Sequence, residues 1–427
     1  MLSHEDNELL CRIGGKTPMG RMMRRYWIPA LMSEELEAGG APKRVRLLGE
    51  TLVAFRDSSG AVGILDESCP HRGASLVLAR NEDCGLRCLY HGWKIDVDGR
   101  ILEMPAEPDA KNFKERVRAT AYPTHEAGGI VWTYLGPRGT EPPPPDFEFT
   151  FAPPSQRIVM KVRAECNWVQ VLEGVIDSAH TNYLHADGIL PSSALPTTMY
   201  TGGTGVGRPS NDGQPRIEME NTPYGFRYAA IRKPLVDPDV RDYVRVTLFV
   251  APFYGFFPAP DGWGFLEAFV PIDDVSTMFW FIQQKYEGEI DIATRERNAT
   301  RAGMRVGIDI DHEFRKRQTY ENNWNQDREA MKKGAFSGIT GVQCQDMAVE
   351  ESMGVLYDRS KEHLGASDVA VIRMRRLMLD AVRAFSDDGA PPLGLAGKTS
   401  LRTLRADELM LPIGESWLER AVGSVPA

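Results

Sequence analysis

The segment CPHRGASLVLARNEDCGLRCLYHGW, from Cys69 to Trp93, contains two short pairs of cysteine and histidine. The first pair, Cys69 and His71, has the spacing C-x-H, and the second, Cys88 and His91, has the spacing C-x-x-H. Two thiolates and two imidazoles can bind zinc, because structural zinc sites use two short ligand pairs. Zinc sites usually pair cysteine with cysteine and histidine with histidine, whereas each pair here mixes sulfur and nitrogen. Mixed pairs suit a [2Fe-2S] cluster in which the cysteines hold one iron and the histidines hold the other.

The motifs CPHRG and CLYHGW resemble the two loops of the Rieske iron–sulfur domain. Imidazole ligands raise the reduction potential of such a cluster to about −150 to +300 mV, against about −400 mV for an all-cysteine cluster. A cluster of this kind accepts and passes on single electrons. The flanking sequence is rich in short β-type runs, and the proline-rich stretch PRGTEPPPPDF, Pro137 to Phe147, marks its end. We therefore expect an N-terminal segment and Rieske domain over residues 1–145 and a second domain over 146–427.

The composition excludes several classes of protein. The chain has 427 residues, 42% of them hydrophobic, which is enough for a large core in two or three domains. Its net charge of −9 gives no basic face for nucleic acid or anionic lipid. No secretory signal or long apolar run is visible, so we expect a cytoplasmic protein without a membrane partner. Six cysteines are too few for a disulfide scaffold.

A second group of metal-binding residues lies in NWVQVLEGVIDSAHTNYLH. Asp177 and His180 share one face of a regular helix, but His185 would be rotated well off that face. The helix from Val169 to His185 must therefore end or distort if both histidines meet one metal. Two histidines and one carboxylate, with coordination positions left open, form the facial triad of non-haem Fe(II) oxygenases.

The two motifs together resemble the catalytic α subunit of Rieske non-haem iron oxygenases, over essentially the whole chain. The resemblance implies an α+β fold: an all-β Rieske domain followed by a helix-grip (START-like) catalytic domain with an antiparallel sheet and helices. It also implies a carboxylate ligand from a late helix, for which we choose Asp346 in GVQCQDMAVEESMG. Its rivals are Glu350 and Glu351 on the same helix, and Asp309 and Asp311 before it.

The same resemblance gives Asp177 a role between the two metal sites. In the family this acid accepts hydrogen bonds from the outer nitrogens of two metal-bound imidazoles, here His180 and His91 of a neighbouring subunit. Electron transfer then takes place between subunits, which implies a ring-shaped homotrimer or stacked trimers.

Oxygen chemistry at such a site needs two electrons for each O2, and NAD(P)H delivers them as a pair. A flavin must split the pair, yet the glycine-rich stretch GGTGVGRPS at Gly202 does not open a helix as a dinucleotide fingerprint would. We therefore expect a separate flavin-containing reductase, with or without a fused ferredoxin.

Several segments, among them MRRYWIPALMSEEL and CQDMAVEESMG, resemble the phthalate dioxygenase branch of the family. The branch acts on aromatic carboxylates, so we expect arginines, whose planar fork suits a carboxylate, to bind the substrate. The candidates are Arg208 and Arg245, with a further hydrogen bond from Ser178. The predicted reaction is O2-dependent cis-dihydroxylation of phthalate or a related acid. The alternatives are monooxygenation, such as O-demethylation or aryl-ether cleavage, and an electron carrier or ligand-binding module without oxygenase activity.

Overall fold

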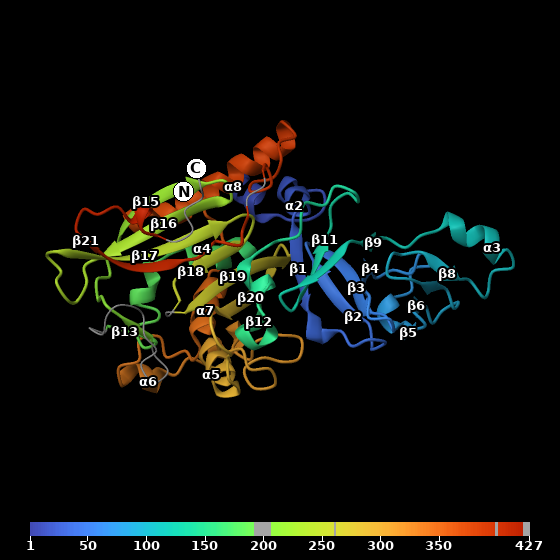
Figure 1. Ribbon diagram of the computed structural model, residues 1–427, viewed down its shortest axis with the longest axis horizontal. Coiled ribbons are helices and arrows are strands. Elements are labelled where there is room, and N and C mark those ends of the chain that lie inside the picture. Colours follow the sequence, from blue (N-terminus) through green and yellow to red (C-terminus); the bar gives the residue numbers. More distant parts are fainter. Residues whose placement is uncertain (192–205, 260–261, 398–399, 422–427) are drawn as a thin grey trace. The chain divides into compact units, whose positions relative to one another are not determined.

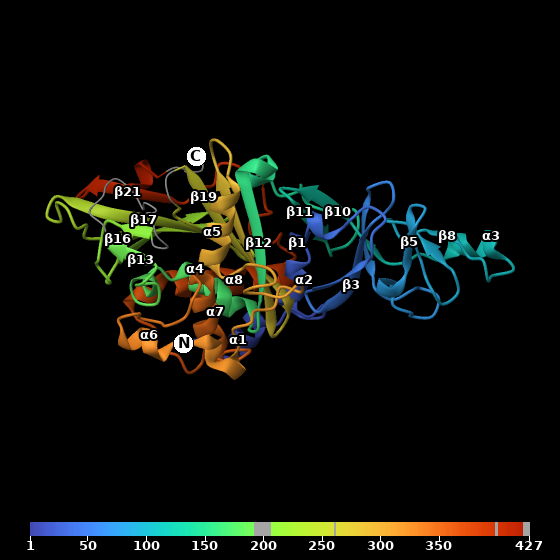
Figure 2. The ribbon, with the colours of Figure 1, turned by 90° about the horizontal axis from the view of Figure 1, so that it is seen from below.

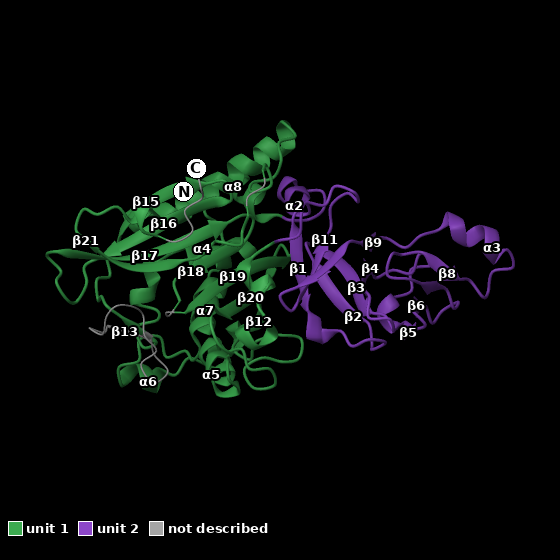
Figure 3. Ribbon diagram, viewed as in Figure 1, with its two compact units in different colours: residues 1–12, 146–427 green, residues 13–145 purple. Residues whose placement is uncertain are grey.

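The computed structural model describes residues 1–427 except 192–205, 260–261, 398–399 and 422–427. Of the glycines in the stretch at Gly202, Gly202, Gly203 and Gly205 lie outside the described residues, and Gly207 lies in β14 (Val206–Arg208). The chain divides into two compact units, one of residues Ile13–Pro145 and one of Met1–Arg12 with Asp146–Ala427 (Figure 3). Among the described residues, no helix is both long and apolar enough to cross a bilayer.

The first twelve residues differ from the expected domain division, which put them in the N-terminal domain. Helix α1 (His4–Cys11) packs instead against α8 (Val369–Asp387) in the second unit. Leu10 and Cys11 are fully buried there, and the Asn7 amide donates a hydrogen bond to the Tyr357 carbonyl at 3.0 Å. The burial of Leu10 and Cys11 holds the segment in the second unit.

The unit of residues Ile13–Pro145 is built from three small antiparallel sheets. One sheet contains β1 (Trp27–Met32), β11 (Ile130–Tyr134) and β10 (Thr124–Ala127), and the next contains β2 (Lys43–Leu47), β3 (Glu50–Arg56), β4 (Val62–Asp66) and β9 (Ala121–Tyr122). The third contains β5 (Arg80–Glu82), β6 (Gly85–Arg87), β7 (Lys94–Ile95) and β8 (Ile101–Glu103). Two short helices complete the unit, α2 (Pro18–Met23) and α3 (Ala110–Phe113).

The other unit is organised around an eight-stranded sheet within the described ranges. Its order is β12 (Arg157–Ala164), β20 (Ser276–Lys285), β19 (Trp263–Asp273), β18 (Tyr254–Phe257), β17 (Arg241–Val250), β16 (Gly225–Arg232) and β15 (Arg216–Thr222). The eighth strand, β21 (Asp407–Pro412), pairs with the first half of β17, while β18 pairs with its second half. A separate parallel pair consists of β13 (Ile189–Pro191) and β14 (Val206–Arg208).

Helices cover one face of this sheet (Figures 1 and 2). Helix α4 (Trp168–Ile176) packs on β17 to β20, and α8 packs on β15 and β16. Helix α7 (Val342–Ser352) packs against α4, and α5 (Ile292–Ala302) packs against α7. The predicted α+β class, with a β-rich N-terminal unit and a helix-covered antiparallel sheet, is confirmed.

The stretch from Tyr320 to Lys333 does not form one continuous helix. Its backbone forms a 3-10 segment at Tyr320–Asn325 and then a short α6 (Arg328–Lys332). Asn323 and Trp324 adopt left-handed φ angles of 51°, which interrupt a regular helix. Asp327 then caps α6 by accepting hydrogen bonds from the next backbone amides.

Candidate active site

In the unit of residues Ile13–Pro145, two loops of similar conformation carry the cysteine and histidine pairs. One loop carries Cys69 and His71, and the other carries Cys88 and His91. In each loop the cysteine N–H donates to a carbonyl five residues later, that of Ala74 for Cys69 and that of Trp93 for Cys88, both at 2.9 Å. The glycines of both loops, Gly73 and Gly92, have positive φ angles, which let the chain reverse beyond each histidine.

The loops bring like groups together. The rings of His71 and His91 lie 4.4 Å apart between centroids, and the thiols of Cys69 and Cys88 lie within hydrogen-bonding range of each other. Burial raises the pKa of the Cys69 thiol to about 11. The Nδ1 atom of His91 is buried without a hydrogen-bond partner among the described residues. A pair of buried thiols beside two imidazoles, one with an unused ring nitrogen, fits a [2Fe-2S] cluster.

The helix that carries the second motif ends where the two histidines require it to end. Helix α4 stops at Ile176, and Asp177 follows as its C-cap with extended backbone angles. A 3-10 turn, His180–Asn182, comes next. The break removes the regular 100° rotation per residue, so that His180 and His185 can face the same point.

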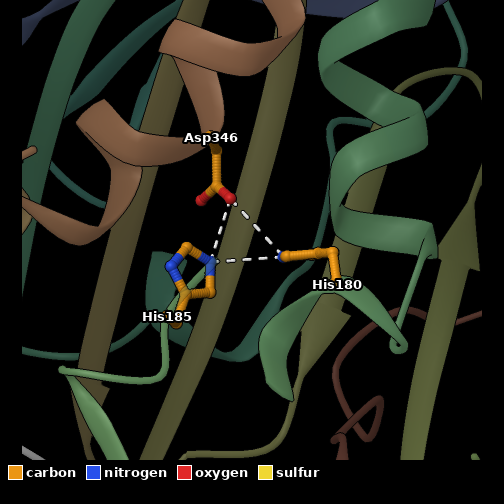
Figure 4. Close-up of side chains that lie close together, drawn as sticks. All are labelled: His180, His185 and Asp346. Carbon is orange, nitrogen blue, oxygen red and sulfur yellow. Dashed lines mark hydrogen bonds and ion pairs between the residues drawn. The ribbon is translucent and has the colours of Figure 1, made fainter. Parts of the chain in front are cut away.

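His180, His185 and Asp346 point toward one another, and their ligand atoms all lie within 4.8 Å (Figure 4). The Nε2 atoms of the two histidines are 3.2 Å apart. Asp346 Oδ1 lies 2.9 Å from His185 Nε2 and 3.4 Å from His180 Nε2. Two imidazoles and one carboxylate converge as in a facial triad, which fits an Fe(II) ion with open coordination positions.

The outer nitrogen of each imidazole has its own partner. His180 Nδ1 lies 3.5 Å from Asp177 Oδ2, and His185 Nδ1 lies 2.7 Å from Gln345 Oε1. Asp177 Oδ1 also accepts the backbone N–H of Ala179 at 2.7 Å. Burial opposes ionisation of Asp177, but the hydrogen bonds from His180 and Ala179 outweigh it and keep the pKa of this carboxyl low. Asp177 is thus an anionic acceptor beside one metal-binding histidine.

The rival carboxylates are engaged elsewhere or lie farther along α7. Glu351 accepts hydrogen bonds from Lys316 and from the Trp324 indole. Asp309 pairs with Arg305 at 2.7 Å, and Asp311 accepts backbone N–H groups of its own loop. Glu350 lines the same cavity as Asp346 but is not part of the three-residue cluster. The geometry brings Asp346, and not its rivals, to the two histidines.

A cavity of about 140 Å³ adjoins the triad. Residues of α4, α5, α7 and β16 to β20 line it. Six aromatic rings line it, those of Tyr228, Phe257, Phe265, Phe269, Phe279 and Phe281. The polar groups of its wall, besides the three cluster residues, include those of Asp177, Ser178, Glu267, Arg245 and Arg301. An apolar space with a few convergent polar groups is typical of a small-molecule site.

The two predicted arginines lie in different surroundings. Arg245 lines the cavity, and its Nε lies 3.7 Å from Glu408 Oε1. Arg208 is buried, donates to Asn182 and to Thr181 Oγ1, and is not among the described residues that line the cavity. Burial and the nearby Arg245 lower the pKa of Arg208 to about 9. The guanidinium groups of Arg208 and Arg245 therefore place two positive charges close enough to repel each other.

Comparison with known proteins agrees with both motifs. Residues 26–114 match the Rieske [2Fe-2S] domain, and residues 133–425 match the domain described as LigXa C-terminal domain like. The chain is 46% identical to the phthalate 4,5-dioxygenase oxygenase subunit of Pseudomonas putida over 90% of this chain and 87% of that one. The chain belongs to the Rieske non-haem iron oxygenases.

Other relatives of the oxygenase extend the comparison. The chain is 37% identical to the 3-chlorobenzoate-3,4-dioxygenase oxygenase subunit of Comamonas testosteroni, over 97% of this chain and 96% of the relative. Its fold is similar to the terminal oxygenase of carbazole 1,9a-dioxygenase from Nocardioides aromaticivorans, with a TM-score of 0.55 and 17% identity over 86% of this chain and 97% of the other.

Membership in this family confirms the predicted cofactors, a Rieske cluster and a mononuclear iron. The oxygenase is the component of a multicomponent system for aromatic compounds that needs a reductase or ferredoxin partner.

Sequence reasoning missed three polar residues of the site. Gln345 orients His185, Arg232 donates to the Ser178 carbonyl at 2.7 Å and to its hydroxyl at 3.2 Å, and Glu267 lines the cavity. The alternation of side chains along β16 places Arg232 on the same face as Tyr228, a signal that requires the strand's register to be known. Gln345 could have been found, since it precedes a proposed ligand.

Proposed function

We propose that this oxygenase performs O2-dependent cis-dihydroxylation of an aromatic carboxylate, with phthalate or a phthalate-like acid as the first candidate. The observation that carries the proposal is Arg245, a buried guanidinium in the wall of an aromatic cavity that also holds His180, His185 and Asp346. A planar cation at the edge of an apolar cavity suits a flat ring that carries a carboxylate.

The surroundings of Arg245 support an anionic ligand. Arg245 lies opposite Ala230 on β16 and opposite Glu408 on β21, and Arg232 lies two residues beyond Ala230 on the same face. Burial and repulsion from Arg245 lower the pKa of Arg232 to about 10. A carboxylate bound beside Arg245 relieves this repulsion between buried cations.

Ser178 and Arg208 complete the proposed substrate-binding set. The Ser178 hydroxyl accepts a hydrogen bond from Arg232 and lines the cavity, so its own proton is free to point toward a ligand oxygen. Arg208 holds Thr181 and Asn182, the residues directly after His180, and leaves its Nε as a buried donor with no partner within the described part of the chain. In this proposal Arg208 reaches the substrate carboxylate after rearrangement of these bonds.

At the iron site, Asp177 and Gln345 hold the outer nitrogens of the two imidazoles, so that both Nε2 atoms face Asp346. These partners fix the rings and favour metal binding. The aromatic walls exclude water and hold the ring of the substrate beside the metal. His180, His185 and Asp346 would hold the iron, which would supply the binding and reductive activation of O2.

For the electron path, we propose that Cys69 and Cys88 hold one iron of the cluster and that His71 and His91 hold the other. Asp177 accepts from His180 on one side, and its partner on the other is His91 of a neighbouring subunit in a homotrimer or stacked trimers. The anionic state of Asp177 supports this role, because a carboxylate can accept hydrogen bonds from two imidazoles. The electrons come from NAD(P)H through a separate flavin-containing reductase.

Monooxygenation is the second candidate. It is favoured by the 33% identity, over 90% of this chain, to the 5,5'-dehydrodivanillate O-demethylase oxygenase subunit of Sphingobium sp.. A screen of aromatic acids with a surrogate reductase, reading O2 uptake and product mass together, separates the two reactions. A product that gains both oxygen atoms and two hydrogens supports dihydroxylation, a gain of one oxygen or loss of methyl as formaldehyde supports monooxygenation, and turnover of neutral rings alone would contradict the proposal.

A further inference from the structure

Glu267 is a buried acid on the floor of the active-site cavity. It lies on β19 between Phe265 and Phe269, whose side chains share its face of the strand, and opposite Phe281 on β20. All four side chains line the cavity, and Glu267 is only 6% exposed. A carboxyl group in such aromatic surroundings is costly unless a partner satisfies it.

Two other buried acids of the same unit, Glu173 and Glu351, have charged partners that explain them. Glu173 pairs with Arg359 and Arg375, and Glu351 pairs with Lys316. Glu267 has instead a hydrogen bond from the Gln343 side chain. Burial therefore raises its pKa well above the ordinary value, and the neutral acid keeps an O–H donor.

The register of the sheet places this acid far from Arg245 within one cavity. Phe249 on β17 is opposite Gly255 on β18, and Gly255 is opposite Glu267 on β19. Arg245 is four residues before Phe249 and on the same face. With about 4.8 Å between strands and about 3.3 Å per residue, the two Cα atoms are about 16 Å apart. Both side chains line the cavity, so a ligand that extends along it can meet Arg245 at one end and Glu267 at the other.

Glu350, the other buried acid of the cavity, has a different position. It lies on α7 one turn after Asp346, and its Oε1 occupies the space that a Cβ at Gly174 of α4 would need. Its packing against the helix backbone, and not on the sheet floor, makes it a suitable comparison for Glu267.

We propose that Glu267 determines specificity by donating a hydrogen bond to a neutral polar substituent, such as a hydroxyl, methoxy or carbonyl group, on the ring edge opposite the carboxylate. This inference rests on the proposed function, because Arg245 holds the carboxylate at the other end. A neutral donor can satisfy an acceptor oxygen but cannot compensate the desolvation of a second anion at that edge. Among substituted benzoates, the oxygenase therefore prefers those with an acceptor oxygen at the meta or para position.

The test uses pairs of ligands of equal size. Binding of 3- and 4-methoxybenzoate and of 3- and 4-ethylbenzoate to the anaerobic holoenzyme is measured by calorimetry, with terephthalate as the dianion. Wild type should prefer the methoxy member of at least one pair about fivefold, the contribution of one hydrogen bond. Glu267→Met should abolish the preference, Glu267→Gln should keep it because an amide still donates, and Glu350→Met should leave the ratio unchanged.

The outcomes separate this inference from the proposed function. Equal affinities for methoxy and ethyl ligands in wild type, an unchanged ratio in Glu267→Met, or tightest binding of terephthalate would each overturn the role of Glu267. Glu267→Ala serves as a second truncation if the Met variant loses its iron, and metal content together with the electron paramagnetic resonance signal of the cluster reports folding. If none of the acids binds, or if Arg245→Met leaves their affinities unchanged, the proposed function fails instead.

Discussion

His185 Nδ1 lies 2.7 Å from Gln345 Oε1, and Gln345 is the residue directly before Asp346. The Gln345 amide nitrogen donates to the Ile339 carbonyl at 2.8 Å and to Ser337 Oγ at 3.0 Å, which fixes the amide with its oxygen toward the imidazole. His185 must then carry its proton on Nδ1, and its Nε2 lone pair faces Asp346. One helix thus supplies a carboxylate ligand and sets the tautomer of a histidine ligand.

Gln345→Leu should therefore weaken iron binding about 10- to 100-fold, the usual effect of losing a group that orients a metal ligand. Iron retained per chain during titration with a chelator measures the change. Gln345→Glu, which keeps an acceptor oxygen, is the matched control and should retain most of the affinity. Equal iron affinity in the Leu variant and wild type would show that His185 needs no such partner.

Asp177→Asn should leave both metal sites occupied but greatly slow reoxidation of the reduced cluster in the presence of substrate and O2. The amide oxygen can still accept the Ala179 N–H, so the turn is kept, but it lacks the charge needed to accept from two imidazoles. Stopped-flow absorbance of the cluster gives the rate. Asp346→Asn should instead lose iron. A wild-type rate in Asp177→Asn would remove Asp177 from the electron path.

His91→Cys tests the assignment of the cluster ligands. A thiolate adds negative charge where a neutral imidazole was bound, so a cluster that forms should have a lower reduction potential. Redox titration followed by electron paramagnetic resonance measures the shift. His125→Cys, in the same unit but outside the two loops, should leave the potential unchanged. A zinc-loaded, colourless wild-type protein would contradict the cluster itself.

Arg245→Met should reduce kcat/KM for the best acid by an amount equivalent to about 2 to 5 kcal/mol, because the substrate anion loses its partner in a desolvated site. Neutral analogues should be affected much less. Arg227→Met is the matched control, since Arg227 is also buried, on β16, but pairs with Glu220 and stacks over Trp417. Equal losses for acids and neutral rings would show a structural effect and not a carboxylate contact.

The buried carboxylate of Glu173 predicts a pH dependence of stability. Burial opposes its ionisation, but Arg359 and Arg375, at 2.8 Å and 2.6 Å, outweigh burial and lower its pKa. A folded-state pKa below the unfolded value of about 4.3 gives stability that is present above that pH and is lost as the pH falls through the folded value.

Glu173→Gln should therefore cost about 3 to 5 kcal/mol at pH 7, since it leaves two buried cations without their carboxylate. Its difference from wild type in urea unfolding should shrink below about pH 4. Glu329→Gln, which removes an exposed pair with Lys332, should change little at either pH. A constant difference between pH 7 and pH 3 would exclude ionisation of Glu173 as its cause.

Local patterns predicted the parts of the site that depend on short spacing. The C-x-H and C-x-x-H pairs indicated the cluster loops, and the five-residue gap between His180 and His185 required the helix break seen after Ile176. Helix α5 was missed although Asp291 caps its start and Gly303, with φ 71°, ends it. Those two signals are local and could have been used.

Residues joined only by the register of the sheet could not be predicted in the same way. Glu267 and Arg245 are brought into one cavity by pairings through β18, and no local pattern reports those pairings. The same holds for Arg208, whose spacing from Thr181 in sequence gives no sign of their 2.9 Å hydrogen bond. Whether a charged residue in a strand is buried can be predicted only when its neighbours across the sheet are known.

The position of α1 in the catalytic unit affects the order in which the two units can fold during synthesis. The ribosome makes this eight-residue helix before the β unit, but Tyr357, its partner through Asn7, comes 350 residues later. So short a helix is not stable alone in water, and we expect it to stay unfolded while Ile13–Pro145 folds. The catalytic unit can complete its fold only after Tyr357 and α8, the partners of α1, have been made. A chain that stops early can then carry a finished electron-transfer unit, but not a finished unit that reacts with oxygen.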